Sequence, residues 1–258
     1  MVKIPIKNAQ EIQKMREAGR AAATVLDRLA QCVQPGVNTY DLDQTAHRFM
    51  KEIEAESACF NYAVGSKRYP CYTCISVNEE VVHGISRIDR VLRVGDCVSL
   101  DVVVRYQGFI GDNARTVLIE PVSQEVKHLV ESTEAALYHA IEKAAKPGKR
   151  IGDISYTIQT FIERRRLSIV RDFVGHGIGR SMHEEPQIPN FGQRRTGPRL
   201  TSGMTLAIEP MVNLGTPHVE ITQDNWTVVT RDRKPSAHFE HTVLINSQGA
   251  EILTKLKK

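Results

Sequence analysis

The chain has 258 residues, of which 41% are hydrophobic and 25% are charged, and its formal net charge is +4. This composition is typical of a globular protein of one large domain or two small ones. The mild positive charge predicts no specific nucleic-acid partner. No apolar run reaches the roughly 18 residues of a membrane span, and we expect neither membrane insertion nor a signal peptide.

Five cysteines are present, an odd number in a chain that is not small, so a disulfide framework is not expected. Cys71 and Cys74 form a lone C-x-x-C motif without the second ligand pair that a zinc site needs. We interpret this pair as incidental or as the lining of a pocket. The cysteine usage predicts a reducing, cytoplasmic environment.

Two predicted helices come first. Asn8 is a suitable N-cap for a helix through about Cys32, and Thr39 opens a second helix through about Glu56. β-branched runs then predict strands near 73–78, 97–105 and 109–119.

The same order follows in the second half. Ser123 starts a predicted helix that ends at Pro147-Gly148, and Asp153 starts another through about Arg166, whose basic end we interpret as a solvated face. Four strands are expected after these helices, near 204–212, 217–222, 225–230 and 239–246.

Residue matches support an internal duplication. Three pairs of segments agree in the same order, namely QPGVNTYDLD (34–43) with KPGKRIGDIS (146–155), VVHGI (81–85) with VGHGI (174–178), and LRVGDCVSLDVVV (92–104) with LTSGMTLAIEPMV (200–212). The repeat is too long for a solenoid. It predicts one α+β domain, residues 1–258, whose halves (about 1–122 and 123–258) share an antiparallel sheet covered by two helical pairs. The ligand site is expected between the halves.

The segment 97–119 predicts an acidic hairpin. Asp101 and Asp112 lie eleven residues apart around a Gln107-Gly108 turn, and strand alternation places both side chains on one face. Apolar neighbours suggest that both are partly buried, where two carboxylates must bind a proton or share a cation. The alternative is that one of them caps the turn or pairs with Arg115.

Further acids lie in predicted strands. Glu209 ends the run GMTLAIEP, Glu240 lies in AHFEHTVLIN, and His176 supplies a nitrogen in FVGHGIGRSMHEEP. A dinucleotide fingerprint is excluded there, because position 180 is arginine and no helix signal follows. Four carboxylates and one imidazole suit a pair of divalent ions (Co, Mn, Fe or Zn), which can hold a bridging hydroxide and polarise a carbonyl.

These residues, with NEEVVHGI around His83 and the segment around His183, resemble the type I methionine aminopeptidases over nearly the whole chain. The resemblance implies the pseudo-two-fold pita-bread fold and removal of the initiator methionine from nascent proteins when the second residue is small. It also implies a monomer, and ribosome association is an open possibility because the substrates are nascent chains.

The resemblance assigns roles by position. Asp101 is expected to bind one metal through both oxygens, Asp112 and Glu240 to bridge the two metals, and His176 and Glu209 to complete the other, with Glu209 also handling the proton of the attacking water. His183 is expected to stabilise the tetrahedral intermediate. His83 is expected to contact the scissile amide nitrogen or that intermediate, a packed core histidine being the alternative.

The methionine pocket is expected to be lined by cysteine and aromatic side chains, here Cys59, Tyr62, Tyr69, Cys74 and Trp226. Two departures from the family pattern affect this wall. The segment 61–74 is a few residues longer than is common in bacterial members, and Met182 stands where an aromatic residue is usual.

Two other functions remain open. The first is a proline-specific peptidase on the same fold, which usually carries an extra N-terminal domain. The second is a binding module that lacks activity, which the presence of all five expected metal ligands disfavours.

Overall fold

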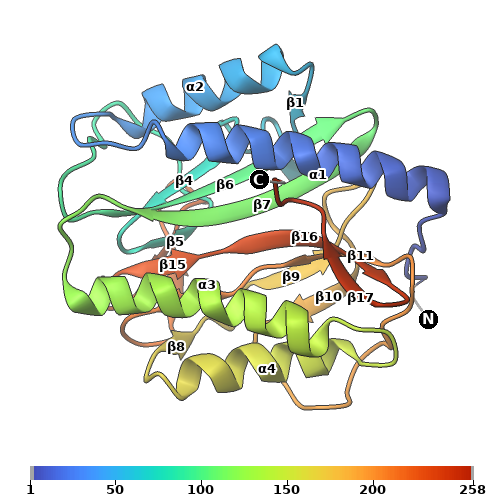
Figure 1. The fold of residues 1–258 in the computed structure, drawn as a ribbon. Helices are drawn as coiled ribbons and strands as arrows, with labels where there is room; N and C mark the ends of the chain where they lie inside the picture. The colour runs from blue at the N-terminus through green and yellow to red at the C-terminus, as the bar shows by residue number, and fades with distance from the viewer. Residues whose placement is uncertain (1–2, 257–258) are drawn as a thin grey trace.

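A computed structural model describes residues 3–256. Helices α1 (Ala9–Ala30) and α2 (Thr39–Glu52) lie together at one side of the strands, and α3 (Gln124–Ala144) and α4 (Ile151–Glu163) lie together at the other (Figure 1). In this view, strands from both parts of the chain are seen between the two helical pairs (Figure 1). The α+β class and the two covering helical pairs are thereby confirmed.

The central sheet contains strands from both halves of the sequence. Its path runs β1-β6-β7-β16-β11-β9-β10, with β4 also paired to β6 and β17 to β16, and every pairing is antiparallel. The strands are β1 (Glu56–Ser57), β4 (Cys74–Val77), β6 (Cys97–Tyr106), β7 (Phe109–Leu118), β9 (Val174–Gly177), β10 (Glu184–Pro189), β11 (Thr205–Ile208), β16 (Glu240–Asn246) and β17 (Gly249–Ile252).

Three smaller antiparallel sheets border the central one. The first contains β8 (Ser168–Ile169), β12 (Met211–Asn213) and β15 (Ser236–His238). The second contains β5 (Glu80–Val82), β13 (Val219–Ile221) and β14 (Val228–Thr230), and the third is a hairpin of β2 (Ala63–Val64) and β3 (Lys67–Arg68).

Three of the four helices begin where the capping residues predict, whereas α4 begins at Ile151, two residues before Asp153, whose carboxylate accepts the Arg150 backbone N–H from within the first turn. Asn8, Asn38 and Ser123 each accept a backbone N–H of the first turn. Helix α2 is shorter than expected and ends at Glu52, because Glu54 adopts φ +56°, outside the helical region, and β1 begins at Glu56. No helix within residues 3–256 has the length and apolarity to cross a bilayer.

The expected strand over 204–212 divides into two. β11 ends at Ile208, and β12 begins at Met211 in a different sheet. Pro210 lacks the N–H that an uninterrupted ladder would need. Glu209 therefore lies at a joint between two sheets.

The central sheet buries one face against the helices. On β6, Val98, Leu100, Val102 and Val104 pack in a cluster with residues of α1 and α2, while on β16, Val243 and Ile245 pack with residues of α3 and α4. Strand alternation turns the intervening residues of these strands to the other face. At Gly111 a Cβ atom would lie 2.3 Å from the Ala18 carbonyl oxygen, so helix α1 reaches β7 only because this residue has no side chain.

Asp43 ties α2 to the segment that leads into β4. Its Oδ1 accepts hydrogen bonds from the backbone N–H groups of Tyr72 and Thr73, each at 2.9 Å. The residue is 2% exposed, and burial raises the pKa of Asp43 to about 6, although the two N–H donors favour the carboxylate. Because the folded-state pKa exceeds the unfolded one, Asp43 contributes stability below pH 4 that is lost as the pH rises through 6.

We therefore expect Asp43→Asn to become progressively more stable than the parent as the pH rises. The neutral amide keeps the acceptor without a buried charge, and the difference in unfolding free energy should grow by roughly 2–3 kcal/mol between pH 4 and 7. Urea denaturation of the chelator-treated proteins across this range measures it. Asp43→Ala, which leaves both N–H groups unpaired, should cost about 1–3 kcal/mol at every pH. A pH-independent difference for Asp43→Asn would contradict the interpretation.

Candidate metal centre and substrate cleft

The strand register brings the predicted acids to one face of the central sheet. Asp101 on β6 pairs with Ala114 on β7, and Glu240 on β16 pairs with Ala114 from the other side. Asp112 precedes Ala114 by two residues. Paired residues share a face, as do residues two apart on one strand, so all three carboxylates project together.

The pairing of strands from the second half places His176 and Glu209 on the same face of the sheet as the three carboxylates. His176 on β9 pairs with Ala207 on β11, which pairs with Thr242 on β16, two residues from Glu240. Glu209 follows Ala207 by two residues, just beyond the end of β11. All five predicted metal ligands therefore converge from five strands or strand ends.

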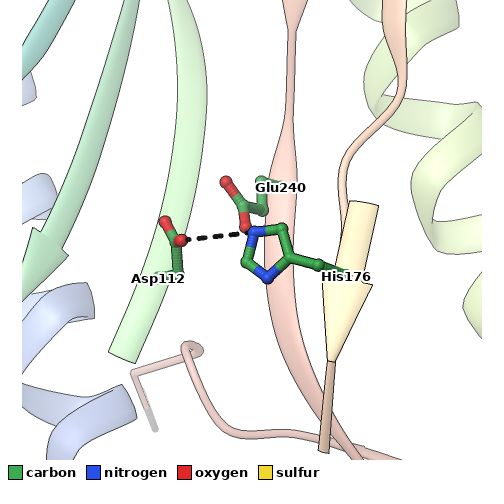
Figure 2. Close-up of side chains that lie close together, drawn as sticks. All are labelled: Asp112, His176 and Glu240. Carbon is green, nitrogen blue, oxygen red and sulfur yellow. Dashed lines mark ion pairs between the residues drawn. The ribbon is translucent and has the colours of Figure 1, made fainter. Parts of the chain in front are cut away.

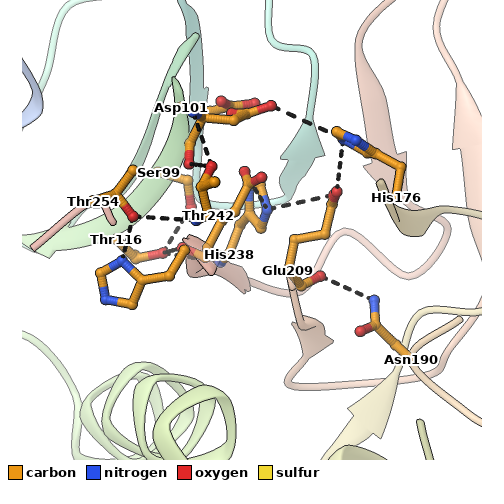
Figure 3. A network of polar contacts seen from close by, with 12 residues as sticks. Ser99, Asp101, Thr116, His176, Asn190, Glu209, His238, Thr242 and Thr254 are labelled. Carbon is orange, nitrogen blue, oxygen red and sulfur yellow. Dashed lines mark hydrogen bonds and ion pairs between the residues drawn. The ribbon is translucent and has the colours of Figure 1, made fainter. Parts of the chain in front are cut away.

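Interatomic distances confirm the convergence. His176 Nε2 lies 3.9 Å from Asp112 Oδ2 and 3.4 Å from Glu209 Oε1 (Figures 2 and 3). Asp112, His176 and Glu240 each offer a ligand atom within 4.8 Å of the others, and Glu209, His238 and Glu240 form a second such group. Glu240 belongs to both groups.

Burial makes the carboxylates hold protons when no cation is bound. It raises the pKa of Asp101 to about 7 and the pKa values of Asp112, Glu209 and Glu240 well above their ordinary range. Neighbouring carboxylates raise the last three further, because like charges in a low-dielectric site repel. Arg115 does not relieve this repulsion, since it pairs with Asp27 at 3.4 Å. The alternative that Arg115 neutralises one of the hairpin acids is therefore wrong.

Several buried oxygens of this cluster lack a partner. Asp101 Oδ1, Asp112 Oδ1 and Glu240 Oε1 accept no hydrogen bond from any group within residues 3–256. An orphaned buried acceptor is costly, and buried charges in proteins are normally paired or coordinate metals. Carboxylate oxygens beside an imidazole nitrogen are suitable donors for divalent transition ions, so this site fits such ions.

His176 is oriented for coordination by its own backbone. Nδ1 lies 3.0 Å from the carbonyl oxygen of Gly177, which can only accept, so Nδ1 carries the hydrogen. The Nε2 lone pair of the neutral ring then faces Asp112 and Glu209. Burial lowers the pKa of His176 to about 4, which keeps the ring neutral at physiological pH.

A cavity of about 510 Å³ opens directly on the cluster. Its lining includes all five predicted metal ligands, both predicted catalytic histidines and the whole predicted methionine wall, namely Asp101, Asp112, His176, Glu209, Glu240, His83, His183, Cys59, Tyr62, Tyr69, Cys74 and Trp226. The structure thus brings together every site residue that the sequence analysis named. This volume falls in the range of roughly 300–1,000 Å³ that is typical of ligand-binding sites.

Part of the cavity wall is apolar and aromatic. Tyr69 packs edge-on against Trp226 with ring centroids 5.3 Å apart, and its hydroxyl donates to the Gly84 carbonyl. Hydrogen bonding with Cys74, together with burial, raises the pKa of Cys59 well above its usual range, and the pKa of Cys74 is raised as well. Both thiols therefore stay neutral, which disfavours a cysteine nucleophile.

The longer segment 61–74 forms the rim of the cavity. It contains the β2–β3 hairpin, from which Val64 lines the cavity and Lys67 Nζ donates to Asn225 Oδ1 at 2.8 Å. Met182 lines the cavity as well. Both departures from the family pattern therefore lie at the cavity.

His83 adopts an unusual backbone conformation beside the cavity. Its φ is +58°, a region that costs free energy for a non-glycine residue, and the ring packs edge-on against Phe173. Burial lowers its pKa to about 4. Such strain clusters at functional sites, which supports the functional interpretation over a packed core histidine.

His183 is held by a tyrosine. Tyr62 Oη lies 2.6 Å from His183 Nδ1, and the rings meet edge-on. When the Tyr62 hydroxyl donates to Nδ1, His183 carries its hydrogen on Nε2, which is then available to donate into the cavity. Tyr62, named only as part of the methionine wall, thus also orients a predicted catalytic side chain.

One histidine of the site was missed by the sequence analysis. His238 is 2% exposed, and its Nε2 lies 3.8 Å from Glu209 Oε2 and 4.0 Å from Glu240 Oε2. Burial lowers the pKa of His238 to about 3. The sequence contained a signal for His238, because it precedes Glu240 by two residues. In an extended segment, residues two apart point to the same face.

Comparison with known proteins defines the class of this protein. Residues 13–247 match metallopeptidase family M24, and the chain belongs to that family. Among its relatives, methionine aminopeptidase 1 of Bacillus subtilis (strain 168) is 46% identical over 250 residues, which cover 97% of this chain and 98% of that protein. The methionine aminopeptidase of Escherichia coli (strain K12) is 42% identical over 255 residues, which cover 98% of this chain and 95% of that protein. The resemblance to methionine aminopeptidases is confirmed.

Solved structures of related proteins show the same fold. The crystal structure of a methionine aminopeptidase from Thermotoga maritima superposes with a TM-score of 0.94 at 44% identity, covering 98% of this chain and 100% of that one. The prolidase of Pyrococcus furiosus superposes with a TM-score of 0.75 at 21% identity. The match covers 98% of this chain and 66% of the prolidase chain, and it shows a likeness of fold alone. The pita-bread fold is confirmed.

Proposed function

We propose that this protein is a methionine aminopeptidase that uses two divalent cations held by Asp101, Asp112, His176, Glu209 and Glu240. The observation that carries the proposal is the set of buried carboxylates with orphaned oxygens beside a cavity that has an aromatic and cysteine-lined wall. Relatives that are 42–46% identical over nearly the whole chain are methionine aminopeptidases.

Each ligand has a distinct place in this proposal. Asp101, Asp112 and Glu240 would hold one cation, and Asp112, Glu240, His176 and Glu209 would hold the other. Support comes from the 3.4 Å approach of His176 Nε2 to Glu209 Oε1 and from the buried, unpartnered oxygens of Asp101, Asp112 and Glu240. When bound, the cations supply Lewis acidity and lower the pKa of a water molecule towards neutrality.

Glu209 is the proposed proton carrier. The carboxylate accepts the proton of the attacking water at an oxygen and returns it to the leaving amine. Its main chain is fixed, because Asn190 Nδ2 donates to the Glu209 carbonyl at 3.0 Å. The joint between β11 and β12 lets this side chain turn into the cavity while its backbone leaves the central sheet.

The two histidines outside the metal shell act on the peptide bond. His183 donates from Nε2 to the carbonyl oxygen as negative charge develops there, with Tyr62 fixing the tautomer. His83 contacts the scissile amide nitrogen or the tetrahedral intermediate. Both line the cavity together with Glu209.

The substrate is the N-terminus of a nascent protein whose second residue is small. Cys59, Tyr62, Tyr69, Cys74 and Trp226 form the wall for the methionine side chain, whose polarizable sulfur suits aromatic neighbours. The proposal further includes a single catalytic domain of two halves and a monomer in the cytoplasm. The shared central sheet supports the single domain.

Peptide hydrolysis tests the function directly. With Co, Mn, Fe or Zn supplied anaerobically, we expect methionine release from Met-Ala-Ser and no cleavage of Xaa-Pro dipeptides that lack an N-terminal methionine, which a prolidase would cleave. Anaerobic titration should saturate at two cations per chain. The absence of methionine release with every cation would sink the proposal.

Glu209→Gln should abolish turnover while the fold persists, because the amide cannot accept the proton. A fall in kcat of at least a hundredfold is expected, in line with loss of a general base. Stopped assays at saturating cation measure it, and circular dichroism checks the fold. Activity within tenfold of the parent would show that the proton is handled elsewhere.

Tyr62→Phe should lower kcat/KM by roughly tenfold, the size of one lost hydrogen bond that orients a catalytic group. The phenyl ring keeps the apolar wall, so KM should change less than kcat. Val64→Ala, at the same rim of the cavity, serves as the control that alters the wall alone. Equal kcat in Tyr62→Phe and the parent would remove the tyrosine from the orientation of His183.

A further inference from the structure

His238 is a buried imidazole aimed at the carboxylates without a hydrogen-bond partner. Its Nε2 is enclosed and forms no hydrogen bond with any group of the described chain, 3–256. It lies 3.8 Å from Glu209 Oε2 and 4.0 Å from Glu240 Oε2 (Figure 3). A buried ring nitrogen in this state is costly unless something binds it.

The distances match shared coordination better than hydrogen bonding. A hydrogen bond requires about 2.7–3.2 Å, and both contacts of His238 are longer. Two donors that each lie about 2.1 Å from one cation are separated by roughly 3–4 Å. His176, the proposed nitrogen ligand, lies 3.4 and 3.9 Å from its own carboxylate neighbours. His238 stands in the same relation to Glu209 and Glu240 as His176 does to Glu209 and Asp112.

We infer that His238 is a sixth protein ligand of the metal centre and binds a cation through Nε2 between Glu209 and Glu240. The inference rests on the proposed dinuclear function and extends it. The centre then holds four carboxylates and two imidazoles. Nitrogen donors favour Co, Fe and Zn over Mn, so His238 shifts the metal preference of this chain toward those ions.

The fold fixes the backbone of His238 so that the ring has little freedom. The His238 N–H donates to Thr116 Oγ1 at 2.9 Å, and the Thr116 hydroxyl lies 2.9 Å from the His238 carbonyl oxygen. β15 also pairs His238 with Met211. These bonds use only main-chain atoms of His238, so they hold the ring in place without occupying Nε2.

Cobalt-loaded protein labelled with ¹⁵N-histidine provides the test. An imidazole bonded to Co²⁺ acquires a large contact shift through that bond, which separates it from the nearby unbound rings of His83 and His183, and we expect two such rings in the parent. His238→Gln should lose one set and His176→Gln the other. His241→Gln is the matched control, because that buried ring has its two nitrogens 3.0 Å from Thr254 Oγ1 and Tyr138 Oη, and it should keep both sets.

Metal affinity gives a second readout. His238→Gln should bind Co²⁺ roughly 10–100-fold more weakly than the parent, with a smaller loss for Mn²⁺. Calorimetric titration measures both, with His241→Gln unchanged. Equal Co²⁺ and Mn²⁺ affinities in His238→Gln and the parent would contradict the inference.

The outcomes separate the two proposals. A parent protein that binds no cobalt overturns the dinuclear function itself. A parent that binds two cobalt ions but shows only one coordinated imidazole overturns the role of His238 alone. Because the parent spectrum counts the rings directly, the result holds even if His238→Gln fails to fold.

Discussion

The repulsion among four buried carboxylates on one sheet face is the constraint on which this structure depends. Asp112 and Glu240 place ligand oxygens within 4.8 Å of each other. Two unit charges at that distance repel by about 3 kcal/mol at an effective dielectric of 20, and several such pairs equal a large part of the 5–15 kcal/mol that stabilises a domain. The protein therefore holds these groups protonated or neutralised by cations.

The sheet gives the carboxylates no means of moving apart. Asp101 and Glu240 flank Ala114 on the two neighbours of β7, and the register is fixed on each side by the antiparallel ladder. The opposite faces of β6 and β16 are buried against helices, so a slip by one residue would turn valines and leucines into the cavity. The hydrophobic core thus maintains the electrostatic strain that cations relieve.

Sequence alone predicted the parts that follow from alternation and capping. The two-residue turn at Gln107-Gly108 fixes which residues of the two hairpin strands share a face of the sheet. This register puts Asp101 and Asp112 on the same face. The helix starts followed from Asn8, Thr39 and Ser123. The resemblance to a known family, rather than alternation, supplied the roles of His83 and His183.

What alternation missed has physical causes. β9 and β10 are rich in glycine and proline, which have low strand propensity, and only the ladder with β11 makes β9 part of the sheet. The expected strand over 204–212 broke because Pro210 moves the chain between sheets, a tertiary effect that a local apolar pattern does not contain. His238 was missed because Phe239 and Glu240 already explained the segment as an ordinary strand.

The glycines of β9 connect the fold to the chemistry. A Cβ atom at Gly175 would lie 2.4 Å from the Ala207 carbonyl oxygen, and one at Gly177 would lie 2.1 Å from the Glu185 carbonyl oxygen. Both neighbours of His176 are therefore small so that β11 and β10 can approach β9 closely. That close approach brings Glu209 to within 3.4 Å of the imidazole. The glycine-rich segment holds a histidine against the acids of the next strand, and its spacing serves this packing instead of a phosphate group.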